Sequence, residues 1–191
     1  MKTAILLHGS GGSDSDYFWF EDTKKFLEAR GYTVWWPLLP HTDEPDLAET
    51  SDFVEKYMPA VDEQTIVIGH SSACPLILHM LEAFSAKVAQ VILVSGYYVP
   101  QTNGSSGMLP QSFDWDKIRS KATEIILINS DNDPWGCDDK QARPVAEKLG
   151  ARFIFAEGQG HMGSNTYDQP CREFPLLKKL FYQPNSIQKV V

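Results

Sequence analysis

Six short runs of nearly continuous apolar residues constrain the fold of this chain more than any other feature. They occupy residues 3–9, 32–38, 65–71, 90–96, 124–130 and 152–158. A strand with one face in water alternates polar and apolar side chains, whereas these runs indicate strands that are covered on both faces. A sheet built from such strands needs helices on both of its sides.

Segments of helical length lie between the runs and after the last one, at residues 19–30, 46–58, 75–84, 113–121, 141–150 and 173–182. Asp46 is a capping residue for the second, with Glu49 three positions later, while Pro144 and Pro175 leave the starts of the last two open. Strict alternation of strand and helix predicts an α/β fold. We expect a mostly parallel sheet of about six strands with helices on both faces.

The length of 191 residues, 42% of them hydrophobic, fits one domain over residues 1–191, with residues 183–191 as a frayed tail. A net charge of -8 without a Lys/Arg run argues against nucleic acid or an anionic membrane as partner. No stretch has the length of a membrane span or a signal sequence, so we expect a cytoplasmic protein. The Gly- and Ser-rich residues 99–112 form either a plain surface connection or a flap.

Polar residues follow four of the expected strands, as HGSGG, GHSSA, SDNDPW and EGQGHMG. The carboxyl ends of parallel strands meet at one edge of the sheet, so these four segments should converge. The second of them places Ser71 in a tight turn between a strand and a helix, among the small residues Gly69, Ser72 and Ala73. Such a turn favours Ser71 as a nucleophile, although a serine there can also cap the following helix.

A serine hydroxyl needs a base, and His161 follows the last expected strand among glycines. The imidazole in turn needs a carboxylate, for which Asp131 and Asp133 are candidates. We favour Asp133, because Pro134 biases it toward an extended backbone. The order Ser71, Asp133, His161 is that of the α/β-hydrolase arrangement.

An oxyanion that forms at Ser71 would be bound by backbone N–H groups. We assign these to Ser72 and, in the first loop, Ser10. The helix that follows Ser71 points its amino end at the same place.

The five segments HGSGG, IGHSSACP, LVSGYY, SDNDPW and GQGHM, in this order in a short chain, resemble the small serine-hydrolase family of the retinoblastoma-binding protein 9 and YdeN type. The resemblance runs from Thr3 to about Phe181 and implies a lidless α/β-hydrolase with Ser71, Asp133 and His161 as its triad. The sequence departs from the general pattern at Ala73, where a glycine is usual, and at Met162, where the family often has an aromatic residue.

Side chains near the expected rim could line an apolar acyl pocket: Trp19, Trp135 and Met162, with Tyr97 and Tyr98 as further candidates. We expect no metal, because the histidines and acidic residues lack ligand spacing. We expect no cofactor, because HGSGGS lacks the lysine of a phosphate loop and the full dinucleotide fingerprint.

Of the cysteines, Cys74 falls in a buried helix and Cys137 has no basic neighbour in the sequence, so neither is expected to be an activated thiol. His70 is expected to make a structural hydrogen bond.

These residues predict a serine hydrolase that forms an acyl-enzyme on a small-molecule ester, thioester or amide. A fold does not settle a function, so two alternatives stay open. One is a module that binds a protein partner and carries a vestigial triad. The other is acyl transfer to an acceptor other than water.

Overall fold

The computed structural model describes residues 2–11, 17–100 and 107–181. Its strands form one sheet in the order β2-β1-β3-β4-β5-β6, and every neighbouring pair is parallel. They are β1 (Lys2–Leu7), β2 (Tyr32–Trp35), β3 (Ile66–His70), β4 (Val88–Val94), β5 (Ala122–Asn129) and β6 (Arg152–Phe155). The expected α/β fold is confirmed. The expected tail, and the centre of the 99–112 loop, lie outside the described residues.

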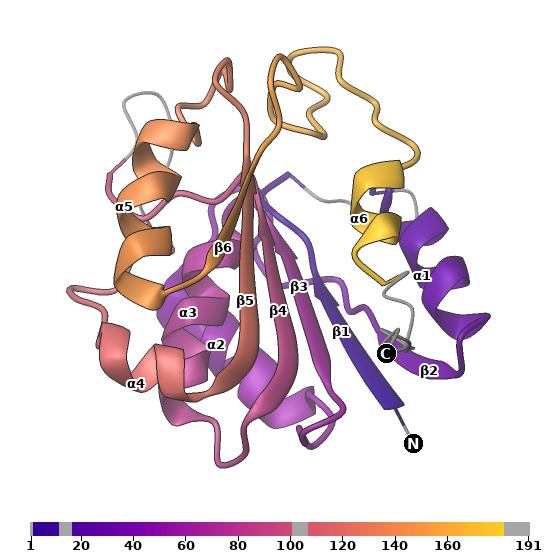
Figure 1. Ribbon diagram of the computed structural model, residues 1–191, viewed down its shortest axis with the longest axis vertical. Coiled ribbons are helices and arrows are strands. Elements are labelled where there is room, and N and C mark those ends of the chain that lie inside the picture. Colours follow the sequence, from indigo (N-terminus) through magenta and orange to yellow (C-terminus); the bar gives the residue numbers. More distant parts are fainter. Residues whose placement is uncertain (1, 12–16, 101–106, 182–191) are drawn as a thin grey trace, which may run out of the picture.

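Helices cover both faces of the sheet, as Figure 1 shows. One face carries α1 (Phe20–Glu28) and α6 (Pro175–Lys179), and the other carries α2 (Leu47–Tyr57), α3 (Ala73–Ala83), α4 (Trp115–Ser120) and α5 (Asp139–Leu149). Of the described residues between β4 and β5, the helical ones form α4, which packs beside α3 and α5 and away from the carboxyl ends of the strands, as expected for a fold without a helical lid. No helix within the described ranges is long and apolar enough to cross a membrane.

The capping residues explain two helix starts. Asp46 accepts the Glu49 N–H with its side chain, as expected. Asp138 caps α5 in the same way, so that Pro144 lies inside this helix rather than at its start.

The continuous apolar runs are explained by a core on each side of the sheet. In β4, Val91 and Leu93 join the core under α2–α5, while Ile92 and Val94 join the core under α1 and α6. Strand side chains alternate between faces, so a strand with two apolar faces has no polar positions.

The strand order places the switch point of the chain's connections beside β1. This strand lies between β2 and β3, and the chain leaves it toward α1 on one face, whereas it leaves β3 toward α3 on the other. In open α/β sheets, ligands generally bind at the carboxyl ends of the strands where connections diverge in this way. The segments after β1 and β3 therefore flank the position where a ligand is expected.

Candidate active site

Ser71 occupies a strained turn between β3 and α3. Its φ is 55°, in the left-handed region that non-glycine residues rarely adopt. Its N–H donates to the Val94 carbonyl at 2.9 Å and its own carbonyl accepts the Cys74 N–H at 3.0 Å, so backbone bonds hold the turn. Ser72 stands at the N-cap of α3 without a capping side-chain bond. Among the described residues the Ser71 hydroxyl has no hydrogen-bond partner, so it neither caps the helix nor bonds to the His161 ring here.

The loop after β1 lies directly against this turn. A Cβ added to Gly9 would lie 2.7 Å from the Ser71 Cβ, which shows how closely the two backbones approach. One residue further on, the Ser10 hydroxyl donates to the Ser72 hydroxyl at 2.9 Å. The structure thus places the two residues expected to bind an oxyanion side by side next to Ser71. In the described part of the chain, neither backbone N–H is used in a hydrogen bond.

His161 and Asp133 form a buried pair on the same rim. The His161 Nδ1 donates to the Asp133 Oδ2 at 2.7 Å, and the other carboxylate oxygen accepts the Trp135 N–H at 2.8 Å. Asp131 is exposed and accepts the Gly158 N–H instead. With the Asp133 oxygen as acceptor, the His161 Nδ1 that faces it is the donor and carries a ring proton. In this tautomer Nε2 is the acceptor nitrogen, and it has no hydrogen-bond partner among the described residues.

Hydrogen bonds fix both the carbonyl and the N–H of the His161 backbone. Its carbonyl accepts the Ser95 hydroxyl and the His70 Nε2, each at 2.9 Å, and its N–H donates to the Gln169 Oε1 at 2.8 Å. The rings of His70 and His161 lie 4.9 Å apart between centroids. His161 is therefore held directly beside the residue that precedes Ser71.

His70 also connects His161 to the first loop. A carbonyl only accepts, so His70 carries its proton on Nε2 and its Nδ1 accepts the Tyr17 hydroxyl at 3.0 Å. The Tyr17 oxygen in turn accepts the Gly9 N–H at 3.0 Å. Burial, together with the nearby His161, holds the pKa of His70 well below its usual value and keeps the ring neutral, as this chain of bonds requires. His70 has the structural hydrogen bonds expected of it.

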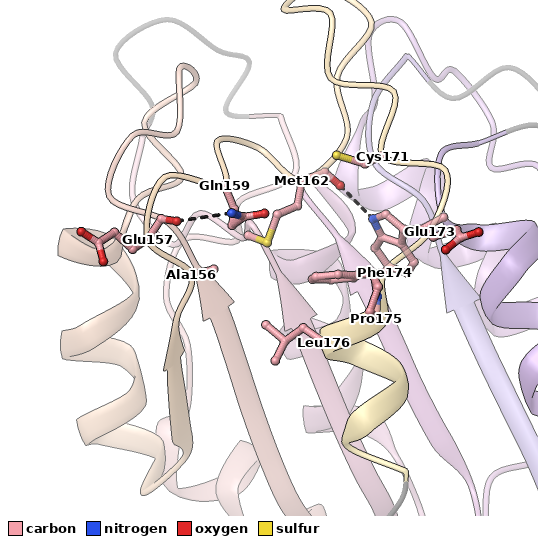
Figure 2. Close-up of a pocket in the computed structure, with 10 residues that line it drawn as sticks. Ala156, Glu157, Gln159, Met162, Cys171, Glu173, Phe174, Pro175 and Leu176 are labelled. Atoms are coloured by element: carbon pink, nitrogen blue, oxygen red, sulfur yellow. Dashed lines mark hydrogen bonds between the residues drawn. The ribbon is translucent and has the colours of Figure 1, made fainter.

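The residues proposed for a substrate pocket are divided between two places. Trp19 is fully buried and donates its indole N–H to the Met162 carbonyl at 2.8 Å. Both line a cavity of about 370 Å³ between the loop after β6 and the segment that leads into α6 (Figure 2), and neither Ser71 nor His161 lines it. The half-buried ring of Trp135 instead meets the His161 ring edge-on at 6.5 Å. Trp19 is separated from Trp135 because it stands at the start of α1, on the face of the sheet away from α3.

The other aromatic candidates, Tyr97 and Tyr98, are buried in the core under α2–α5.

Three residues that fix the site were not found from the sequence: Tyr17, Ser95 and Gln169. Ser95 directly follows β4, so its place at a strand end was a usable signal. Tyr17 and Gln169 lie in irregular segments whose course no periodicity predicts.

The match to known proteins covers nearly the whole chain. The model of the serine hydrolase family matches residues 4–181. The chain belongs to the serine hydrolase family. This serine hydrolase is 29% identical over 177 residues to serine hydrolase RBBP9 of Rattus norvegicus, covering 88% of this chain and 91% of that protein. It is 30% identical over 167 residues to the putative hydrolase YdeN of Bacillus subtilis (strain 168), covering 84% and 85% of the two chains.

A solved structure agrees with these relatives. The crystal structure of the ydeN gene product from B. subtilis has a TM-score of 0.84 to this serine hydrolase at 26% identity, and covers 95% of this chain and 97% of that one. The resemblance drawn from the sequence motifs is confirmed, and with it a hydrolase function.

Proposed function

We propose that this serine hydrolase is a carboxylesterase that forms an acyl-enzyme on Ser71, with His161 as its base and Asp133 as the acid that orients it. The observation that carries the proposal is the buried 2.7 Å bond from the His161 Nδ1 to Asp133. It leaves the His161 Nε2 as a proton acceptor on the rim that also holds Ser71.

The first half-reaction begins when the Ser71 hydroxyl rotates toward the His161 Nε2. The structure does not show this contact, and catalytic hydrogen bonds commonly tighten only in the complex with substrate. The Ser71 Oγ attacks the ester carbonyl carbon while its proton passes to the His161 Nε2. The carbonyl oxygen becomes an oxyanion that the N–H groups of Ser10 and Ser72 bind.

The intermediate then collapses. The bond from the carbonyl carbon to the leaving oxygen breaks, and that oxygen takes the proton from the His161 Nε2. In the second half-reaction a water molecule gives its proton to the same nitrogen and attacks the acyl group, and Ser71 recovers the proton as the acid leaves. Asp133 stabilises the imidazolium in both halves.

We infer a small substrate. Among the described residues, the helix between β4 and β5 packs beside α3 and α5 and does not cover the rim. Esters, thioesters or amides with small acyl groups suit such a site better than long chains, which need a deep enclosed pocket.

Hydrolysis of p-nitrophenyl esters tests the proposal. The acetate should be cleaved faster than the octanoate, and Ser71→Ala should lower the rate by about a thousandfold or more. The exposed Ser85, in the turn after α3, offers a control, and Ser85→Ala should keep the rate. Turnover that survives Ser71→Ala would refute the proposal. A binding module for a protein partner, the alternative raised by the sequence, would show no turnover on any ester, and analysis of the products separates hydrolysis from transfer to another acceptor.

A further inference from the structure

Cys137 lies beside the His161–Asp133 pair. Its Sγ, a carboxylate oxygen of Asp133 and a ring nitrogen of His161 are all within 4.8 Å of one another, and all three residues are buried. The thiol is reduced, since Cys137 belongs to no disulfide. The sequence gives Cys137 no basic neighbour, but the turn from β5 into α5 brings it to one.

The same turn holds Cys137 in place. The Asn129 side chain donates to the Cys137 carbonyl at 2.8 Å, and Gly136, with a φ of 78°, provides the bend that precedes it. Asp133, three residues before Gly136, belongs to this turn as well. Two of the three donor atoms therefore come from one short segment, and His161 supplies the third from the loop after β6.

A thiolate, an imidazole and a carboxylate form a donor set suited to Zn²⁺. Zinc binds such atoms at about 2.0–2.3 Å, so tetrahedral donors lie roughly 3.5 Å apart. Small movements of the sulfur and of the His161 ring would bring the present cluster to that spacing. The Trp135 N–H, which already donates to the Asp133 Oδ1, would orient the carboxylate from outside the metal shell.

We propose that Asp133, Cys137 and His161 form an inhibitory Zn²⁺ site. On binding, the Cys137 thiol loses its proton to solvent, and the metal takes the lone pair of the His161 Nδ1. The ring stays neutral, so its proton moves from Nδ1 to Nε2. An Nε2 that carries a proton cannot accept one from Ser71, so zinc stops catalysis by fixing the wrong tautomer of His161. This consequence for activity rests on the proposed function, whereas the metal site itself does not.

The metal site is tested without any substrate. Cd²⁺ bound to a thiolate has an ultraviolet charge-transfer band, and Cd²⁺ takes the same kind of ligands as Zn²⁺. One equivalent of Cd²⁺ should produce the band in the wild type and in Cys171→Ser, which removes the partly exposed cysteine. The band should be absent in Cys137→Ser. A band that is missing from the wild type, or that persists in Cys137→Ser, would overturn the site.

The inhibition is tested with p-nitrophenyl acetate. Zn²⁺ should stop turnover, EDTA should restore it, and Mg²⁺ should have no effect. For each variant, half inhibition is measured against that variant's own metal-free rate. The Zn²⁺ concentration that gives half inhibition should be about tenfold or more higher in Cys137→Ser than in the wild type, and should be unchanged in Cys171→Ser. Equal sensitivity of Cys137→Ser and the wild type would contradict the proposal.

Two further controls keep these outcomes separate. If Cys137→Ser fails to fold, as circular dichroism would reveal, Cys137→Ala removes the same ligand without adding a buried hydroxyl. If the metal-free wild type cleaves no ester, the proposed function fails, and the Cd²⁺ band still decides whether the site exists.

Discussion

Replacing tyrosine by phenylalanine should change the free energy of unfolding differently at two buried positions, Tyr17 and Tyr98. In Tyr17→Phe, the lost hydroxyl leaves the Gly9 N–H and the His70 Nδ1 without their partners. Each buried group left unpaired costs about 1–3 kcal/mol, so the free energy of unfolding should fall by about 2–6 kcal/mol. The Tyr98 hydroxyl is equally buried but has no hydrogen-bond partner among the described residues. Tyr98→Phe should therefore leave the stability unchanged or raise it by about 1 kcal/mol.

Charge does not complicate this comparison, because burial raises the pKa of both tyrosines above the usual value. Urea unfolding measures the difference, with equal m values showing that the midpoints report stability alone. In a thermal scan, each 1 kcal/mol corresponds to about 2–4 °C for a chain of this size.

Ester turnover gives a second measurement, since Gly9 precedes Ser10, the proposed oxyanion donor, and of the two tyrosines only Tyr17 is hydrogen-bonded to Gly9. Tyr17→Phe should lower turnover, and Tyr98→Phe should not. Equal loss of stability in the two variants, or a larger loss in Tyr98→Phe, would refute the assigned hydrogen bonds.

Three more predictions follow from the site. Asp133→Asn should lower turnover of p-nitrophenyl acetate by about 10⁴-fold, because the amide stabilises the wrong tautomer of the His161 ring; a loss below about tenfold in steady-state kinetics would exclude the assigned role. Gly9→Ala sets a methyl 2.7 Å from the Ser71 Cβ, so displacement of the oxyanion loop should cost about a hundredfold in kcat, and an unchanged kcat would exclude the close approach. Burial lowers the pKa of both His8 and His70 from the 6.5 expected for the unfolded chain. Below about pH 6.5 the unfolded chain therefore binds more protons than the folded protein. The free energy of unfolding should fall between pH 6.5 and pH 5, by up to about 1.4 kcal/mol per pH unit for each of the two histidines. Equal urea midpoints at the two ends of this range would contradict the burial of these rings.

The strands and the helix order could be predicted because each follows from local pattern. Short apolar runs rich in β-branched residues, such as residues 90–96, favour strands covered on both faces, and a cap such as Asp46 marks its helix start by residue type. The parallel sheet then brings the strand ends together, which is why Ser71, Asp133 and His161 could be chosen from separate segments.

Contacts that depend on which face a side chain reaches could not be predicted in this way. Trp19 and Trp135 both stand near the rim in sequence, but α1 carries Trp19 to the opposite face of the sheet from α3. Cys137 approaches His161 only because two loops from different strands meet. Tyr17 reaches His70 from an irregular segment, and no pattern in the sequence encodes that path.

Reaction with a fluorophosphonate probe tests most directly whether Ser71 is the nucleophile that His161 activates. Intact mass should show a single adduct on the wild type, peptide mapping should locate it on Ser71, and the labelling rate should fall sharply in His161→Ala. An adduct on any other residue, or one that still forms in Ser71→Ala, would contradict the account.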